Sequence, residues 1–520
     1  MTGDQVVKRL KAWAAGKPLP RGSTLHVHIA QNPDLLIVAF VRMGGESAPW
    51  GIAYGFPGTK PTILTVPEGR NRTLVADMAA EFAPALLRHF RHRDYDRGSP
   101  AGPKQIGALR QLWLPNRTHL DMLHFIAYAY TFTRVGERDR AKTLNKLGRA
   151  TGWLFREAMR PGQQTVMVAS EALQTAYTFP AEDVRQAHLG FLLAWAATKG
   201  GRDARLRAAG DAERSAVATS LDPPVERDDL QPSVDDWNEA HRNNDAKAQS
   251  RHAGAIEAKL RPELVRRFEL TERAIEVLRK DPRRVNRGVE SLVAVSSEEL
   301  WYQFLRQELK IDDKEDGPAI TLSPETDRHP AVAASRYYVH EASDELYLSA
   351  LVHDDDEMQA EAVAEGHALR GIIAKVEDVD PGRRMEPIWT LIVNDDAPLR
   401  VREGSWLCVA GLPKRSARVR SIERAGPGKL EVQVEIIGWK KKPKDGPRGV
   451  LAADDPRLVG ADVTLVPNSG EGMFRRKSQK AWERGTPGEW LTHSRPAGPQ
   501  TALPDDVGEN IDDLVKRLGK

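Results

Sequence analysis

The spacing of apolar residues changes twice along this chain, and no other feature constrains its fold as strongly. Before residue 97, apolar runs of strand length lie between turn residues. From 105 to 310, apolar residues recur every three or four positions, which is the period of helices that bury one face. From 368 to 439, short strand-type runs return. This segregation predicts a multidomain α+β protein, and 520 residues are enough for three or four domains.

The first predicted unit is a small mixed α and β domain over residues 1–97. It is expected to begin with a helix over 1–15 and to end with a helix over 72–88, whose apolar residues recur every four positions. Between these helices the sequence predicts strands at 24–30, 35–41, 50–56 and 61–66.

The second predicted unit, residues 105–310, is a large and irregular helical domain. Its amphipathic segments show no fixed period, which favours irregular packing over the alternative, a helical repeat array. Residues 219–250 are polar and contain Pro223, Pro224 and Pro232. A surface loop with little order is therefore expected there.

The two segments that follow differ sharply in charge. Residues 311–365 contain 15 Asp/Glu against 3 Lys/Arg, and residues 401–484 contain 18 Lys/Arg against 10 Asp/Glu. The net charge of +3 conceals this asymmetry, which sets up local fields of opposite sign. We interpret 311–365 as an acidic linker with strands at 336–342 and 345–353.

Residues 368–439 form the most regular β segment in the sequence. Five short strands separated by Gly, Pro and Asp turns are expected, at 369–379, 387–395, 405–411, 417–425 and 429–439. Five strands in about seventy residues suit a small five-stranded barrel. In its architecture this segment is similar to the accessory barrels inserted in superfamily 1 helicases and in many nucleic-acid enzymes. Residues 440–520 are expected to be a basic, Gly/Pro-rich extension that ends in a helix.

Composition narrows the setting in which the chain works. Cys408 is the single cysteine, which excludes an intrachain disulfide and any multi-cysteine zinc or iron–sulfur site. Its place in an apolar strand predicts a buried, inert thiol. The first residues lack an apolar signal segment, and no stretch is apolar enough to span a bilayer. We therefore expect a cytoplasmic, bacterial protein with no membrane contact.

Motifs for nucleotide and hydrolase chemistry are not found in the sequence. The nearest approach to a P-loop, residues 55–62, places Thr59 between Gly58 and Lys60 and so has the wrong spacing. No Gly-x-Gly-x-x-Gly follows a strand, no Gly-x-Ser-x-Gly occurs, and His340-Glu341 lacks the second histidine of a zinc protease. The sequence favours a protein that is not an enzyme, and it predicts no cofactor.

Two groups of residues are candidates for a metal site. His26 and His28 alternate on the predicted strand 24–30, which would place both rings on one face about 6–7 Å apart. Asp34, His89 and His92 are conceivable further ligands. The second group is 353–357, which includes Asp354, together with His367. A solvated strand face and a charged loop are the alternative interpretations.

Basic clusters beside the predicted barrel point to nucleic acid, because small barrels pair cations for phosphates with aromatic rings for bases. Trp389 is a further possible stacking residue, although a tryptophan in a strand is usually core. The alternatives are a solvated basic face or a dock for an acidic partner, including the chain's own residues 311–365. The expected contacts are Lys414, Arg415, Arg418, Arg420, Lys440, Lys441, Lys442, Lys444, Arg475, Arg476, Lys477, Trp406 and Trp439.

The sequence therefore leads to three hypotheses. The first is an accessory or scaffold subunit that binds DNA or RNA through the C-terminal barrel region. It would work beside a separate ATPase, helicase or nuclease, as in antiviral (phage) defence. The second is a metal-dependent nuclease whose site is not visible as a motif. The third is an assembly subunit with protein partners only.

Overall fold

The computed structural model describes residues 3–44, 47–90, 110–133, 139–181, 183–281, 347–377, 386–395, 398–437 and 451–467. All of them belong to one compact unit, which is formed by residues 1–322 and 343–471. The fold is mixed α and β with more than one sheet, as the sequence predicts at this level. No helix in the described ranges is both long and apolar enough to cross a membrane.

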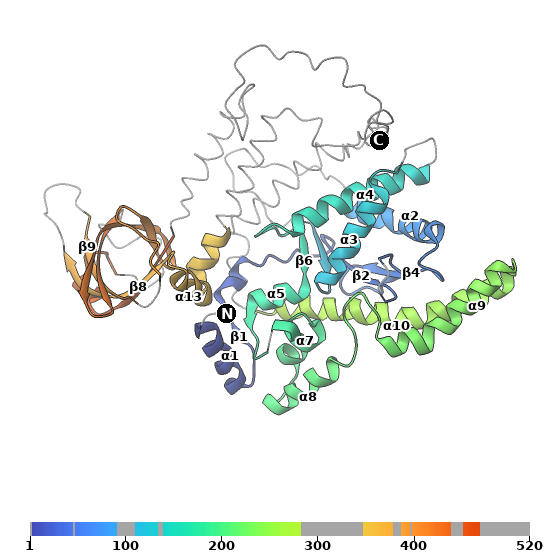
Figure 1. The fold of residues 1–520 in the computed structure, drawn as a ribbon, viewed down its shortest axis with the longest axis horizontal. Helices are drawn as coiled ribbons and strands as arrows, with labels where there is room; N and C mark the ends of the chain where they lie inside the picture. The colour runs from blue at the N-terminus through green and yellow to red at the C-terminus, as the bar shows by residue number, and fades with distance from the viewer. Residues whose placement is uncertain are drawn as a thin grey trace, which may run out of the picture. The chain divides into compact units, whose positions relative to one another are not determined.

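A five-stranded mixed sheet, ordered β4-β3-β2-β5-β6, lies at the centre of the N-terminal part (Figure 1). β3 pairs antiparallel with both β2 and β4. On the other side of β2, β5 runs parallel to β2, and β6 runs parallel to β5. The strands β2, β3 and β4 agree with the predicted strands at 35–41, 50–56 and 61–66. The strands are β2 (Leu35–Val41), β3 (Gly51–Gly55), β4 (Thr62–Thr65), β5 (Gln111–Leu114) and β6 (Val166–Val168).

Both faces of this sheet are covered, so the uninterrupted apolar run of β2 is buried along its whole length. Leu36, Val38 and Phe40 point into a core shared with helices α2 (Arg72–His89), α3 (Arg117–Tyr130) and α4 (Asp139–Ala158). The alternate residues of β2 point into a second core, built with helices on the other face. These are α5 (Ala169–Ala176), α7 (Leu189–Ala197) and α10 (Ala246–Arg279).

The predicted division near residues 97–105 falls inside this sheet. Strands β5 and β6 come from the range 105–310, which the sequence suggested was helical, and they extend the sheet from β2. Residues 1–97 and 105–281 thus share their cores. The two strands escaped prediction because they are only four and three residues long, too short to show a period.

The predicted polar loop at 219–250 is wrong over most of its length. Helix α9 (Gln231–Arg242) occupies it, preceded by the short helix η3 (Val225–Leu230), and α10 begins at Ala246. Val234, Trp237 and Ala240 recur every three residues and are buried. Pro232 lies in the first turn of α9, where the lack of a backbone N–H costs nothing.

Smaller elements complete the N-terminal part. Helix α1 (Gly3–Ala15) agrees with its prediction, and β1 (Leu19–Pro20) pairs with β7 (Tyr177–Thr178) in a two-stranded sheet. The remaining helices are α6 (Asp183–Gln186) and α8 (Arg202–Ala212).

Two predicted strands are replaced by helix. Residues 24–30 are not a strand: the 3-10 helix η1 (Gly22–His26) occupies the start of this range, and no strand follows. Residues 347–353 of the predicted strand 345–353 are helical, in a helix that continues to residue 354 and leads directly into α13 (Asp356–Ala364). Short apolar runs fit either structure, and tertiary packing decides between them. The other predicted strand of the acidic range, 336–342, lies outside the described residues.

The C-terminal sheet contains the five strands that the sequence predicts and a sixth, β13. All neighbours are antiparallel, and β13 pairs with both β8 and β10, so that the order β10-β11-β12-β9-β8-β13 closes on itself. The predicted number of five strands is therefore wrong, because β8 and β10 need β13 between them. A short 3-10 helix, η6 (Pro456–Leu458), precedes β13. The strands are β8 (Leu369–Glu377), β9 (Ile388–Asn394), β10 (Trp406–Val409), β11 (Leu412–Gly426), β12 (Lys429–Ile437) and β13 (Asp462–Pro467).

A buried histidine bridges the gap where β2 and β5 separate. The two strands pair only over Leu35–Ile37, so the end of β2 needs other partners. Phe40 N donates to His119 Nδ1 at 3.0 Å, and His119 Nε2 donates to the carbonyl of Val217 at 3.0 Å. The amide of Arg42, the residue that follows β2, donates to the carbonyl of Thr219 at 2.8 Å. The segment 216–222 thus takes the place of a neighbouring strand.

This segment is held in place by a fully buried arginine. Arg267 Nε donates to the carbonyl of Ala218 at 2.8 Å and Arg267 Nη2 to that of Ser220 at 3.0 Å. Its charge is balanced by Glu263, whose Oε2 lies 2.8 Å from Arg267 Nη1. Open α/β sheets usually bind ligands at the carboxyl ends of their parallel strands. In this protein the chain itself fills that place.

His119 predicts a pH dependence of stability. Burial lowers its pKa to about 3 from 6.5. Below about pH 6.5 the unfolded chain therefore binds a proton that the folded chain excludes. The stability that neutral His119 contributes is present above pH 6.5 and is lost as pH falls, by at most about 1.4 kcal/mol per pH unit.

We expect His119→Phe to destabilise the protein at pH 7 by about 1–3 kcal/mol, because Phe40 N and the Val217 carbonyl lose their partner. The difference in unfolding free energy between the two proteins should narrow at pH 5, measured by urea denaturation. The control is His367→Gln, at an exposed histidine whose ring meets Arg400 at the surface, and it should match the parent at both pH values. An equal difference at pH 7 and pH 5 would contradict the role assigned to His119.

Candidate functional site

The predicted nucleic-acid residues fall into two sets. Trp406, Lys414, Arg415, Arg418 and Arg420 lie on β10 and β11 of the closed six-stranded sheet. The others lie outside the described residues: Trp439, Lys440, Lys441, Lys442, Lys444, Arg475, Arg476 and Lys477.

Trp406 and Arg418 form an exposed pair on the outer face of this sheet. They are direct partners in the register of β10 and β11. The guanidinium of Arg418 lies 5.9 Å from the centroid of the Trp406 ring, within the range of a cation–π contact. Trp406 keeps 51% of its surface exposed. Side chains alternate between the two faces of a strand, so Leu407 and Ala417 point into the core while this pair points out.

The neighbouring cations do not all reach this face. Arg415 is buried and donates from Nη2 to the carbonyl of Leu451 at 2.8 Å, so its predicted role as a surface contact is wrong. Arg420 is half-exposed and pairs with Glu435 across β11 and β12. Arg415, Ala417 and Val419 are alternate residues of β11, so their side chains point to the same, inner face of the sheet. Counting basic residues in the sequence does not show this orientation.

The basic excess of 401–484 lies mainly outside the described residues. The described ranges 401–437 and 451–467 hold eight Lys/Arg against seven Asp/Glu. The other residues of this segment, 438–450 and 468–484, hold ten Lys/Arg against three Asp/Glu. The surface around Trp406 and Arg418 is therefore nearly neutral by itself, and strong attraction to phosphate would have to come from those two segments.

Two further residues of the closed sheet are structural. Trp389 is buried, and its Nε1 donates to the carbonyl of Ala453 at 2.7 Å, so it does not form part of a binding surface. Cys408 is also buried, as predicted, and burial raises the pKa of its thiol to about 11.

The metal candidates are brought together only in part. His26 Nε2 lies 2.8 Å from Asp354 Oδ2, which unites one residue from each predicted group. His28 does not share a strand face with His26, because no strand forms there. The backbone amide of His28 instead donates to Gln164 Oε1 at 2.8 Å. In the ranges that the structure describes, no three His, Cys, Asp or Glu residues are arranged to hold a metal; His92 lies outside them.

The acidic residues beside Asp354 pack against the N-terminal segment rather than forming a solvated loop. Asp355 is fully buried and accepts from Arg21 Nε at 3.1 Å and Arg21 Nη2 at 3.2 Å. It also accepts from Ser23 N and Ser23 Oγ, at 3.1 and 2.9 Å, and it caps the N-terminus of α13. Glu357 accepts from Thr178, and the exposed Asp356 pairs with Lys8.

This contact is tight. A Cβ atom added to Gly22 would lie 1.6 Å from the carbonyl oxygen of Asp354, so only glycine fits there. Burial alone would raise the pKa of Asp355, but the hydrogen bonds and charge of Arg21, with the two donors of Ser23, outweigh it and lower the pKa to about 2. Residues 354–357 thus pair with Lys8, Arg21 and His26.

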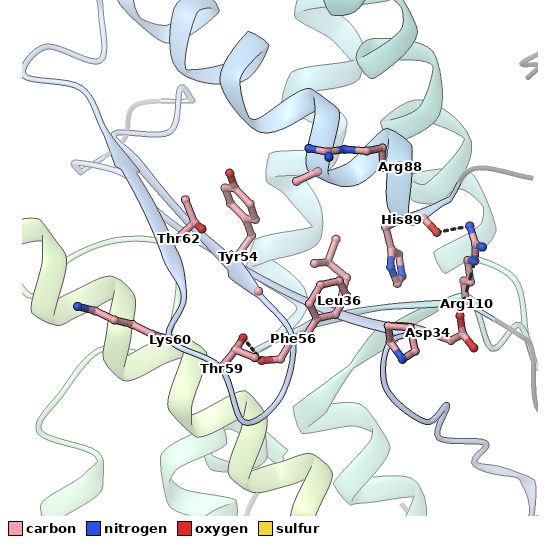
Figure 2. A pocket seen from close by; sticks show the side chains of 13 residues that line it. Asp34, Leu36, Tyr54, Phe56, Thr59, Lys60, Thr62, Arg88, His89 and Arg110 are labelled. Carbon is pink, nitrogen blue, oxygen red and sulfur yellow. Dashed lines mark hydrogen bonds and ion pairs between the residues drawn. The ribbon is translucent and has the colours of Figure 1, made fainter. Parts of the chain in front are cut away.

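A cavity of about 480 Å³ lies at the amino ends of β2 and β5 (Figure 2). Leu36, Tyr54 and Phe56 give it an apolar lining, and Lys60 and Arg88 stand on opposite sides of it. At the far end, Arg110 donates to the carbonyl of His89 at 2.5 Å and lies 3.8 Å from Asp34. The volume suits a small molecule.

Several polar groups of this cavity bind its own walls. His89 Nε2 donates to the carbonyl of Gln111 at 3.0 Å, and Arg88 Nε donates to that of Pro84 at 3.1 Å. Asp34 and His89, which the sequence suggested as metal ligands, are therefore parts of this wall. The cavity gave no signal in the sequence, because its lining comes together only when β2, β3 and α2 pack.

No family model matches this chain, and searches of curated proteins and of solved structures also find no match.

The Arg21–Asp355 ion pair gives a stability prediction. A fall in pKa from 3.8 to about 2 corresponds to about 2 kcal/mol of stabilisation above pH 4, which is lost as pH falls toward 2. We expect Asp355→Asn to lower the free energy of unfolding by at least about 2 kcal/mol, since a buried charge also loses its partner.

A double-mutant cycle with Arg21→Met and Asp355→Asn should give a coupling energy of more than about 1 kcal/mol in urea denaturation. Asp356→Asn is the control: this carboxylate is 65% exposed, and its loss should cost less than about 1 kcal/mol. A coupling energy near zero would show that the pair does not form.

Proposed function

We propose that this protein binds nucleic acid, DNA or RNA, through the outer face of the closed six-stranded sheet around Trp406 and Arg418. The observation that carries this proposal is the exposure of Trp406 beside a guanidinium. A large aromatic ring on the outer face of a strand gains little from the fold, but it can stack on a base. Arg418 beside it supplies a positive charge next to the stacking surface.

The phosphates would be bound mainly by the basic residues that follow in the sequence. Lys440, Lys441 and Lys442 come shortly after the end of β12, whose last residue Ile437 pairs with Ser416 in β11. Arg418 lies two residues further along the same strand. Each phosphate neutralised releases counterions, so binding should weaken steeply with salt.

The proposal extends to an accessory or scaffold role. The chain would present nucleic acid to a separate ATPase, helicase or nuclease, for example in a bacterial antiviral complex. The accessory role is supported by the sequence alone. The rival hypothesis is an assembly subunit with protein partners only: binding to nucleic acid would exclude it, and an absence of binding would favour it.

Fluorescence anisotropy of labelled single- and double-stranded DNA and RNA across a salt series tests the proposal. We expect Trp406→Ala to weaken binding by about fivefold or more, because a base stacked on an aromatic ring contributes about 1–3 kcal/mol. Charge reversal of Lys440, Lys441 and Lys442 together should lower the salt slope by about two to three.

Ile372→Ala is the matched control, because Ile372 is apolar and 52% exposed on β8 of the same sheet. It should bind as the parent does. An absence of binding at low salt, or a Trp406→Ala variant with the affinity of the parent, would refute the proposal and turn attention to protein partners.

A further inference from the structure

We propose that the outer side of helices α3 and α4 is a second contact surface for single-stranded nucleic acid, separate from the closed sheet. The surface consists of an aromatic ridge and a basic stripe. The ridge is formed by His124 and Tyr128 on α3 and by Phe132, two residues after the end of α3, and the stripe lies on α4 (Lys142, Lys146 and Arg156). The two features come from different observations, and neither depends on the closed sheet.

The aromatic ridge is unusually exposed for a helix that packs against a sheet. Tyr128 keeps 83% of its surface exposed and Phe132 keeps 67%. Tyr128 lies four residues after His124, which is also exposed, so these two rings share one face of α3 and are about 6 Å apart along its axis. Phe132 follows two residues after the end of the helix. The core of the fold gains almost nothing from Tyr128 and Phe132.

The basic stripe has unneutralised charge. Lys142, Lys146 and Arg156 are exposed, and in the part of the chain that the structure describes none of their side chains has a hydrogen-bond or ion-pair partner. By contrast, Arg140 pairs with Asp77 and Arg160 with Glu157. The pKa of the neighbouring Arg149 is lowered, first by burial and then by the charge of Arg156. A bound anion would relieve this repulsion.

Close packing of the two helices joins the ridge and the stripe into one surface. A Cβ atom on Gly148 would lie 2.4 Å from Thr131 N, and one on Gly152 would lie 3.3 Å from Ala127 Cβ. The rings of His124 and Phe155 stack with centroids 4.6 Å apart. The helices are therefore antiparallel and in close contact along their length.

Arg156 lies at the seam between the helices. Its Nη1 is 3.7 Å from the place where a Cβ of Gly152 would be, and Gly152 faces the turn of α3 that carries Ala127 and Tyr128. A guanidinium thus lies beside the aromatic ridge, which is the arrangement of a surface that pairs phosphates with stacked bases.

Single-stranded nucleic acid fits this surface better than a duplex. Aromatic rings on a convex helix can stack only on bases that are not already stacked in a double helix. Lys142, Lys146 and Arg156 lie along α4 beside the rings, so the phosphates of a strand stacked on the rings would meet positive charge. An acidic peptide would satisfy the cations but has no flat bases for the rings.

The test uses the full chain and labelled oligo(dT) and oligo(rU) in fluorescence anisotropy. Tyr128→Ser/Phe132→Ser changes only exposed side chains, and we expect it to weaken binding by at least about fivefold. Lys142→Glu/Lys146→Glu/Arg156→Glu should lower the salt slope by about two. Both effects should persist in a Trp406→Ala background, which separates this inference from the proposed function.

The controls are matched in kind. Leu206→Ser removes an exposed apolar side chain on α8. Lys199→Glu/Lys247→Glu/Arg273→Glu makes the same change of net charge at exposed residues elsewhere, in the loop after α7 and on α10. Both should bind as the parent does. The inference is overturned if Tyr128→Ser/Phe132→Ser binds as the parent does, or if the control triple weakens binding as strongly as the α4 triple. It is also overturned if a duplex or poly-glutamate competes as well as the single strand.

Discussion

The C-terminal half of β2 needs hydrogen-bond partners for its backbone, because the neighbouring strand β5 does not extend beside it. β2 is buried on both faces, and an unpaired buried amide costs about 1–3 kcal/mol. β5 accompanies it only as far as Ile37. His119, held neutral by burial, and the segment 216–222, held by Arg267, supply the missing partners. The positions of α3, which carries His119, and of α10, which carries Arg267, follow from this requirement.

Closing that gap has a consequence for function. The carboxyl ends of parallel strands are the usual ligand site of a mixed sheet, because the chain there diverges and leaves a crevice. Here the crevice is filled by the chain itself. Both surfaces for which we propose a ligand lie on the outside of the described fold: Trp406 with Arg418 on the closed sheet, and the aromatic ridge and basic stripe of α3 and α4. Both proposals concern surfaces that pair exposed rings with cations.

The acidic residues show how a charged run can be structural. A run of carboxylates at 354–357 suggests either a metal site or a solvated loop. The structure uses them instead to join the start of α13 to the segment that holds Arg21, Ser23 and His26. Asp355 is both the cap of a helix and the partner of an arginine, so its charge is balanced twice within the protein.

The sequence by itself determined those elements whose apolar spacing is long enough to read. These include α2 with its four-residue period, the buried strands β2 and β3, and the five strands of 368–439, together with the outward position of Arg418 and the buried thiol of Cys408. Tertiary structure alone decided where β5, β6 and β13 pair, since strands of three to six residues carry no period and gain their stability from non-local partners. Tertiary structure also decided that 24–30 and 347–354 form no strand. It placed Arg415 in the interior and Tyr128 on the surface. Local sequence cannot specify these outcomes, because each depends on which distant side chains and backbone groups fill the space beside the residue.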